Sequence, residues 1–312
     1  MASRALGLAM LAVVSAAMPA PNAALESPNA ALRVLGVQVL TVPGDTKANL
    51  ARAAALIRAH PGYDLYVLPE LSCCGYDASV LSRKEEEAEE LLDATKGGRA
   101  GTFFADLACE AKAHICYGFL RRTSSGETTI CQAVASPTGL ACAYDKMHLC
   151  EMGACSEVGF GLSPGAALAT FECGGVRVGL TVCYDLRFPE LYRALAWSHG
   201  CDLILHPSAF VRDATFPAYH TFVTTRAIEN GVYVLSVNHA GEQFGDSIAA
   251  PPWLGPVPGL DAELAPSTLG TEEGVLPLVV AAEELEAVRR AYPYRRNVHP
   301  TLRERDAQRA PS

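Results

Sequence analysis

The chain has 312 residues and a mass of 33.0 kDa; half of its residues are hydrophobic and 19% are charged. This composition supplies a large core and excludes a wholly disordered chain. Because 34 acidic residues outnumber 25 basic ones, the net charge is −9, which argues against a nucleic-acid coat or a polybasic membrane binder. The length allows two domains or one large α/β domain.

The first 25 residues differ from the rest of the chain. Arg4 precedes an apolar stretch from Ala5 to Met18, small residues and prolines follow, and no acidic residue occurs. This order is typical of a secretory signal peptide, with cleavage expected after Ala17 or Ala20. We therefore expect a targeting segment over residues 1–25 that leads to the secretory pathway or an organelle. The alternative is a frayed N-terminus of a cytoplasmic protein. No later stretch is long and apolar enough to span a membrane.

Short apolar runs, typical of buried strands, alternate with helical patterns along the mature chain. The predicted strands are Arg33–Thr41, Asp64–Pro69, Ile115–Arg122, Thr129–Ser136, Leu140–Asp145, a hairpin of Ala167–Glu172 and Val176–Cys183, Asp202–His206, Val232–Asn238 and Val275–Val280. The predicted helices are Thr46–His60, Arg83–Lys96, Thr102–Ala113, Glu190–His199, Phe216–Asn230 and Ala281–Arg290. Ala250–Thr271 is rich in Pro and Gly and predicts a long loop. The pattern favours one α/β domain over residues 31–300, with a C-terminal tail over residues 301–312.

Eleven cysteines are many for this length, and the odd number leaves at least one thiol free or paired between chains. No Cys-x-x-Cys occurs, so the spacing argues against a structural zinc site. We interpret most of these cysteines as small buried hydrophobic residues.

The most informative segment is Gly179–Arg193, GLTVCYDLRFPELYR. An apolar strand runs into Cys183, and a helix is expected to begin near Pro189. Such a turn exposes a nucleophile and leaves backbone N–H groups free for an oxyanion. A buried strand-end thiol is the alternative when Cys183 is taken alone.

Two further reactive side chains each follow an apolar run. Glu70 lies in VLPELSCCGY, and Lys146 lies in YDKMHL. Alone, Glu70 could be a surface acid or a helix cap, and Lys146 could be an exposed lysine.

Together, PE…GY, K-x-H-L and C-Y-D-x-R-F-P-E, in this order, resemble the nitrilase, or carbon–nitrogen hydrolase, superfamily. GLSPG at 161–165, TRAIEN at 225–230 and NHAGEQFGDS at 238–247 also look like blocks of that family. The resemblance covers roughly residues 33–296. It implies a four-layer α-β-β-α sandwich that forms a homodimer or a higher homo-oligomer, and it implies no metal and no organic cofactor.

The resemblance also implies a mechanism. Cys183 would attack the carbonyl carbon of an amide, and Glu70 would act as general base and then as general acid. Lys146 and the backbone N–H of Tyr184 would stabilise the oxyanion. Glu70 would give the thiol proton to the leaving ammonia or amine, and water activated by Glu70 would then hydrolyse the thioester.

The family usually has a second glutamate shortly after the lysine. Glu157, just before the GLSPG turn, fits this place better than Glu151, which comes earlier than expected. Glu157 would orient Lys146 and the nitrogen of the substrate.

The residues that follow Cys183 give information about the substrate, which we expect to be a small amide. Cys183-Tyr184-Asp185 looks like the amidase and carbamoylase branches, whereas typical nitrilases resemble Cys-Trp-Glu. A nitrilase and an acyltransferase that uses the same thioester remain the alternatives. Arg187 either meets a substrate carboxylate or pairs with an internal acid. The segment HPSAFVRDATFPAYHTF departs from the related amidases, and its pocket candidates are Ser208, Phe210, Arg212, Tyr219 and His220.

Overall fold

The computed structural model describes residues 31–91, 97–153, 156–261 and 263–301. The expected targeting segment and all but the first residue of the expected C-terminal tail lie outside these described residues. None of the described helices has both the length and the apolar character needed to cross a membrane.

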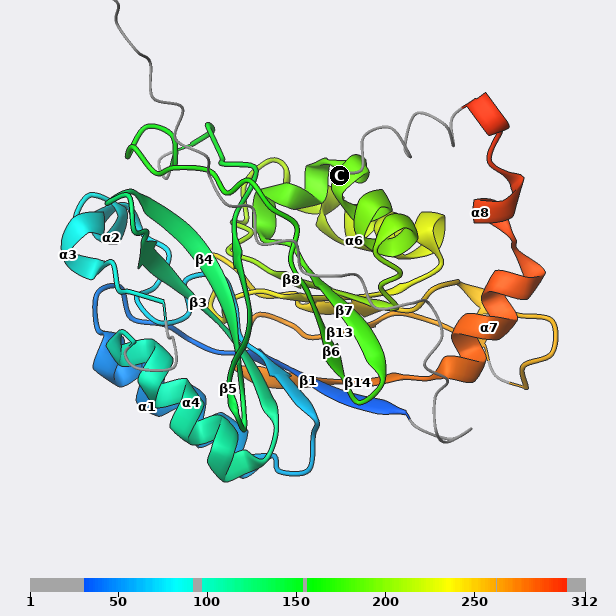
Figure 1. Cartoon of the computed structure of the whole chain (residues 1–312), viewed down its shortest axis with the longest axis horizontal. Helices are drawn as coiled ribbons and strands as arrows, with labels where there is room; N and C mark the ends of the chain where they lie inside the picture. The colour runs from blue at the N-terminus through cyan, green and yellow to red at the C-terminus, as the bar shows by residue number, and fades with distance from the viewer. Residues whose placement is uncertain (1–30, 92–96, 154–155, 262, 302–312) are drawn as a thin grey trace, which may run out of the picture.

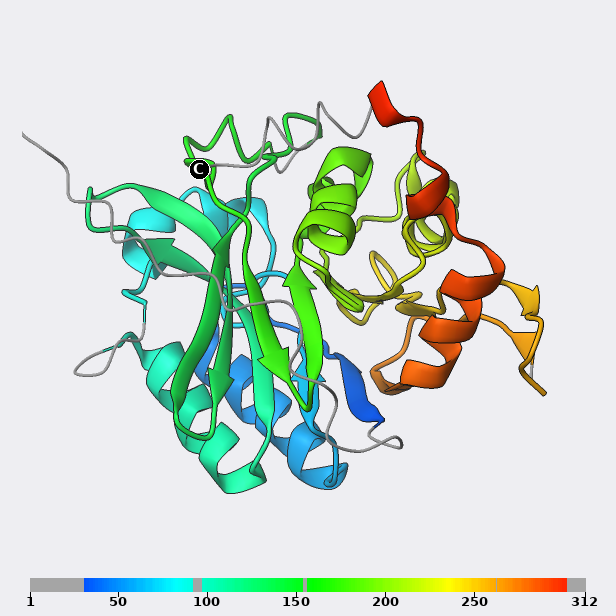
Figure 2. The ribbon, with the colours of Figure 1, turned by 45° about the vertical axis from the view of Figure 1, so that its right-hand side comes forward.

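Two six-stranded sheets form the centre of the molecule (Figures 1 and 2). The first has the order β14-β1-β2-β3-β4-β5 and consists of β1 (Leu32–Gln38), β2 (Leu65–Val67), β3 (His114–Arg122), β4 (Thr128–Ser136), β5 (Gly139–Asp145) and β14 (Gly274–Val280). The second has the order β13-β10-β9-β8-β7-β6 and consists of β6 (Thr170–Cys173), β7 (Val176–Leu180), β8 (Leu203–Pro207), β9 (Tyr233–Val237), β10 (Ile248–Ala250) and β13 (Ser267–Thr268). The neighbours β1, β2 and β3 run parallel, as do β7, β8 and β9.

Helices cover the outer faces of the sheets (Figure 1). The longer helices are α1 (Thr46–Ala59) and α4 (Arg99–Ala111) on the first sheet, α6 (Tyr219–Asn230) on the second, and α7 (Ala282–Ala291). The shorter ones are α2 (Ala78–Leu81), α3 (Lys84–Glu87), α5 (Pro189–Arg193), α8 (Tyr294–Asn297), the 3₁₀ turns η1 (Cys183–Arg187) and η3 (Phe216–Ala218), and the π-helical turn η2 (Ala194–Ser198). In Figures 1 and 2, α7 and α8 lie at one end of the sandwich, outside the stacked layers.

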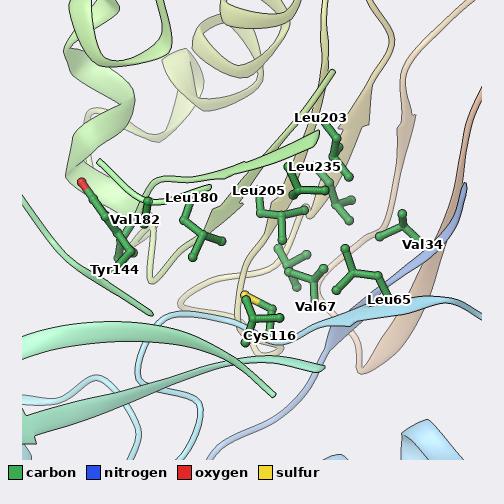
Figure 3. Close-up of a cluster of buried hydrophobic side chains, with 14 of the residues drawn as sticks. Val34, Leu65, Val67, Cys116, Tyr144, Leu180, Val182, Leu203, Leu205 and Leu235 are labelled. Carbon is green, nitrogen blue, oxygen red and sulfur yellow. The ribbon is translucent and has the colours of Figure 1, made fainter. Parts of the chain in front are cut away.

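Three buried apolar clusters hold these layers together. In β2, Leu65 and Val67 face the cluster between the sheets, while Tyr66 faces the cluster under α1 and α4. In β8, Leu205 faces the inter-sheet cluster, whereas Ile204 packs toward α5 and α6. Figure 3 shows the inter-sheet cluster, with side chains of both sheets pointing toward one another. Strands buried on both faces are mostly apolar, as the sequence predicts, although β8 and β9 also carry the buried polar residues His206 and Ser236. The four-layer α-β-β-α sandwich is thus confirmed.

Most predicted elements form within a few residues of their expected bounds, but Arg83–Lys96 does not form one helix. Helix α3 ends at Glu87, and Ala88 is extended and buried. Glu89 then forms an isolated parallel bridge with Arg121 of β3, and its carboxylate accepts a hydrogen bond from the N–H of Ala100 at the start of α4. These contacts outweigh the preference of residues 88–91 for a helix. The last residues of the predicted helix, 92–96, lie outside the described part of the chain.

Two other segments are more structured than expected. The predicted loop Ala250–Thr271 contains β13, which pairs with β10, and a small sheet of β11 (Gly255–Pro256) and β12 (Glu263–Leu264). The predicted helix Glu190–His199 changes from α5 into the π-helical η2 at Ala194.

Candidate active site

Glu70 lies just beyond the carboxyl end of β2 and is fully buried. Its Oε1 accepts a hydrogen bond from Lys146 Nζ at 2.8 Å, and its Oε2 accepts one from the N–H of Ala209 at 2.9 Å. Ala209 follows β8, so the contact joins the two sheets. The backbone after Glu70 turns sharply, with Leu71 in the left-handed region at φ 46°. Gly118 of β3 permits this turn, because a Cβ there would lie 2.4 Å from the nitrogen of Leu71.

Lys146 follows the last residue of β5 and is also fully buried. Its Nζ lies 2.8 Å from Oε1 of Glu70 and 2.6 Å from Oε1 of Glu157. Its carbonyl accepts a hydrogen bond from Gly165, the last residue of the GLSPG turn. A Cβ at Gly165 would lie 2.0 Å from the carbonyl oxygen of Asp145, so this tight approach requires glycine.

Glu157 is the second buried carboxylate at Lys146. Besides Lys146, its Oε1 accepts a hydrogen bond from the hydroxyl of Tyr76 at 2.9 Å, and its Oε2 accepts one from the N–H of Cys150 at 2.8 Å. Glu151 is exposed and is not part of this cluster. The geometry therefore places Glu157, and not Glu151, against Lys146. Tyr76 is a member of the site that the sequence analysis missed, although the PE…GY pattern contains it.

Cys183 begins η1, and two residues separate it from the end of β7, the second strand of the hairpin. Its φ of 42° is left-handed, a costly conformation for a residue that is not glycine and one that clusters at functional sites. In η1, the backbone N–H of Asp185 donates a hydrogen bond to the carbonyl of Val182 at 3.0 Å. The N–H of Tyr184 lies one residue earlier and has no acceptor within this turn, as is usual for the first N–H groups of a helix.

Asp185 ties the turn of Cys183 to the segment that carries Lys146, and the sequence analysis gave it no role. Its buried carboxylate accepts hydrogen bonds from the hydroxyl of Tyr144 at 2.8 Å and from Nδ1 of His148 at 2.7 Å. These two residues flank Lys146 at the end of β5. The sequence signals that could have indicated this contact were the Asp in Cys-Tyr-Asp and the His in K-x-H-L.

The electrostatics of the cluster follow from burial and mutual charge. Burial raises the pKa of Glu70 to about 7; Lys146 acts against this rise and Glu157 adds to it. Burial alone would lower the pKa of Lys146, but Glu157 and Glu70 outweigh it, so the pKa lies well above its usual value. Burial and then the Glu70 carboxylate raise the pKa of the Cys183 thiol. At neutral pH, a fixed cation thus lies beside a carboxylate able to take up a proton and a thiol that retains its own.

The predicted substrate-binding residues lie around this cluster. Ser208 is fully buried; its hydroxyl lowers the pKa of the Cys183 thiol but makes no hydrogen bond of good geometry within the described residues. The guanidinium of half-buried Arg187 lies 5.6 Å from the ring centre of Tyr184 and 5.8 Å from that of Phe210. Within the described part of the chain, Arg187 forms no ion pair, and Nη2 donates to the hydroxyl of Thr215 at 3.2 Å. Of the two alternatives for Arg187, pairing with an internal acid is therefore not seen within ion-pair distance there.

The other pocket candidates have structural contacts. Tyr219 is fully buried and within hydrogen-bond distance of Ser236, and its ring stacks on Phe210; that it lines the pocket stays a prediction. Arg212 forms an ion pair with Asp246 at 2.8 Å, and His220 donates through Nε2 to the carbonyl of Asp246 at 2.7 Å. These two contacts hold the segment after β8 and the start of α6 against the loop that ends at Asp246.

Comparison with known proteins identifies the family. A model of the family described as Carbon-nitrogen hydrolase matches residues 30–269. The chain belongs to the carbon–nitrogen hydrolase family. It is an amidase-like enzyme of that family and is 30% identical over 276 residues to the omega-amidase NIT2 of Homo sapiens, which covers 84% of this chain and 92% of the human protein. It is 31% identical over 201 residues to a protein named nitrilase from Pyrococcus abyssi, covering 63% of this chain and 71% of that one.

Solved structures share the fold of this carbon–nitrogen hydrolase. Nit3 of Saccharomyces cerevisiae, described as a member of branch 10 of the nitrilase superfamily, matches with a TM-score of 0.72 at 24% identity, covering 87% of this chain and 96% of Nit3. A mutant of the amidase from Nesterenkonia AN1 matches with a TM-score of 0.66 at 26% identity, covering 87% and 98%.

Proposed function

We propose that the enzyme hydrolyses the amide bond of a small carboxylate-bearing amide through a thioester on Cys183, with Glu70 and Lys146 completing a catalytic triad. One observation carries this proposal. A buried lysine ammonium contacts two buried carboxylates beside a thiol that begins a strained turn. A cluster so costly to bury would not be kept for stability, since apolar residues fill such a space at least as well.

In the acylation step, the thiol of Cys183 gives its proton to Glu70 while its sulfur attacks the amide carbonyl carbon. The carbonyl oxygen becomes an oxyanion, stabilised by the ammonium of Lys146 and the N–H of Tyr184. Glu70 then gives the proton to the nitrogen, the C–N bond breaks, and ammonia or an amine leaves. The acyl group remains on Cys183 as a thioester.

In the deacylation step, Glu70 takes a proton from water, and the resulting hydroxide attacks the thioester carbon. The C–S bond breaks, the carboxylic acid product leaves, and the Cys183 sulfur regains the proton. Glu157 keeps Lys146 charged and in place in both steps, since the lysine contacts a carboxylate even while Glu70 carries a proton.

Arg187 supplies the selectivity for a carboxylate. A half-buried guanidinium without an acidic partner in the described structure can accept a carboxylate in bidentate geometry. The nearby rings of Tyr184 and Phe210 would exclude water and strengthen such a pair. The name of the human relative, omega-amidase, supports a substrate whose amide stands at the end opposite a carboxylate.

The test is an ammonia-release assay with matched compounds. The amides are succinamate and glutaramate, each with a terminal carboxylate, and butyramide, which lacks one; the nitrile is 3-cyanopropionate. We expect glutaramate or succinamate to give the highest kcat/KM. Release of no ammonia from any of the amides would overturn the proposal.

A nitrilase is the second candidate, favoured by the relative from Pyrococcus abyssi that carries this name. Hydrolysis of 3-cyanopropionate at least a hundredfold faster than any of the amides would establish it. An acyltransferase would form little free acid whether or not an amine acceptor is present, so the acid is measured beside ammonia with and without hydroxylamine. A hydrolase forms the acid in both cases.

A further inference from the structure

A buried histidine contacts the main chain of Cys183. His206 lies in β8, and its Nε2 lies 2.9 Å from the carbonyl oxygen of Cys183. Its Nδ1 lies 2.7 Å from the hydroxyl of Ser236 in β9, and that hydroxyl is within hydrogen-bond distance of the hydroxyl of Tyr219. The contact therefore reaches Cys183 through a chain of three buried polar side chains from β8, β9 and α6.

The partners of His206 fix its tautomer. A carbonyl oxygen can only accept, so Nε2 carries a hydrogen and donates to Cys183. Burial lowers the pKa of His206 to about 4, so the ring is neutral near pH 7 and Nδ1 is an acceptor. The hydroxyl of Ser236 then donates to Nδ1 and accepts from Tyr219. Every hydrogen of the chain points in one direction, toward the carbonyl of Cys183.

The carbonyl of Cys183 belongs to the same peptide group as the N–H of Tyr184. Amide resonance couples the two ends, so a donor at the oxygen makes the N–H a stronger donor, in the way that hydrogen bonds in a chain strengthen one another. The same contact fixes the plane of a peptide that follows a left-handed residue, where the backbone has no local preference to hold it.

We propose that His206 is a positioning residue for the oxyanion site: through the Cys183 carbonyl it orients the Cys183–Tyr184 peptide and strengthens the N–H of Tyr184 as a donor to the substrate oxygen. The proposal rests on the proposed function, in which this N–H and Lys146 stabilise the oxyanion. In this proposal, His206 acts on the main chain of Cys183 and not on its thiol.

His239 offers a matched comparison within the same molecule. It is buried just after β9, and its Nε2 lies 2.7 Å from the carbonyl oxygen of Glu70, while its Nδ1 lies 3.0 Å from the hydroxyl of Thr41. Both histidines donate through Nε2 to a main-chain carbonyl, but the carbonyl that His239 contacts belongs to the proposed base. Loss of His239 should therefore disturb proton transfer from the Cys183 thiol, whereas loss of His206 should not.

The experiment measures two rates on the full chain. The first is kcat/KM for ammonia release from glutaramate, which includes formation of the oxyanion. The second is alkylation of Cys183 by 2-iodoethanol, a reagent without a carbonyl, which requires the thiol and Glu70 but no oxyanion. The variants are His206→Leu, which removes the donor, His206→Gln, whose amide NH₂ donates from a similar position, and His239→Leu.

For His206→Leu we expect kcat/KM to fall at least about fivefold and no further than the 100- to 1,000-fold loss that removal of a whole oxyanion donor causes. Alkylation should stay within about twofold of wild type, and His206→Gln should recover most of the lost activity. For His239→Leu, both rates should fall. Equal losses of both rates in His206→Leu, or unchanged hydrolysis, would overturn the proposal.

If His206→Leu does not fold, Ser236→Ala tests the role of His206 instead. This variant keeps His206 but removes the hydroxyl that donates to its Nδ1, so hydrolysis should fall about 2- to 5-fold while alkylation stays unchanged. Unchanged hydrolysis in a folded Ser236→Ala would count against the proposal. Failure of the proposed function would look different, because wild type itself would then release no ammonia from glutaramate.

Discussion

The ammonium of Lys146 lies 2.8 Å from the carboxylate of Glu70, although 76 positions separate the two residues and neither side chain is exposed. Each group lowers the cost of keeping the other charged in a buried position. The pair also fixes the geometry of the site, because it connects the end of β2 with the end of β5. The first prediction tests the lysine of this pair.

Lys146→Met removes the charge but keeps the length and the apolar bulk of the side chain. If Lys146 stabilises the oxyanion, kcat/KM for glutaramate should fall by at least about 100- to 1,000-fold. The fold should be checked by circular dichroism, because the variant leaves two buried carboxylates without their cation. Lys47→Met, at an exposed position of α1, is the control and should keep normal activity. Near-normal turnover in a folded Lys146→Met would exclude this role.

Glu70→Gln replaces the proposed base with a neutral amide of the same shape. Because an amide cannot accept the thiol proton, hydrolysis should be lost, and labelling of Cys183 by iodoacetamide near pH 7 should slow as well. Loss of hydrolysis alone would not separate a base from a positioning group, so both rates are needed. The exposed Glu110→Gln in α4 serves as the control. If labelling and hydrolysis both stay at wild-type rates, Glu70 is not the base.

The pH profile follows from the raised pKa of Glu70. A general base acts when it is ionised, and the pKa of Glu70 is about 7 instead of its usual value near 4.5. We therefore expect kcat/KM to be low at pH 5, to rise through an apparent pKa near 7 and to level off above pH 8. The apparent value belongs to the coupled cluster and not to Glu70 alone. A profile that is flat from pH 5 to pH 8 would contradict this expectation.

Arg187→Gln tests the recognition of a carboxylate. A hydrogen bond to a charged group contributes about 1.5–3 kcal/mol, so kcat/KM for glutaramate should fall roughly 10- to 150-fold. Butyramide, which has no carboxylate, should be hydrolysed at an unchanged rate by the same variant. An equal loss on both amides would mean that Arg187 supports the structure around Phe210 and Tyr184 and does not select the substrate.

Much of the fold could be predicted from local patterns. The buried strands read as apolar runs, and the hairpin formed where Cys173-Gly174-Gly175 predicted its turn, with both glycines at positive φ. Arg83–Lys96 could not be predicted in this way. Its charge pattern suits a helix, but Glu89 contacts the main chain of β3 and of α4, and neither contact is visible in a local window.

The same limit applies to the site. The motifs named Glu70, Lys146, Glu157 and Cys183, and the structure brings these four together. It also adds contacts that no local pattern shows, because they connect distant parts of the chain. Asp185 contacts Tyr144, 41 positions away, and His239 contacts the main chain of Glu70, 169 positions away.

The most direct test of the account is peptide mass spectrometry of the enzyme quenched with acid during turnover of glutaramate. The account predicts that the peptide containing Cys183 gains the mass of the acyl group, that hydroxylamine removes this mass as a hydroxamate, and that Cys183→Ala shows neither the adduct nor ammonia release. An adduct on another residue, or ammonia release by Cys183→Ala within tenfold of wild type, would contradict the thioester mechanism.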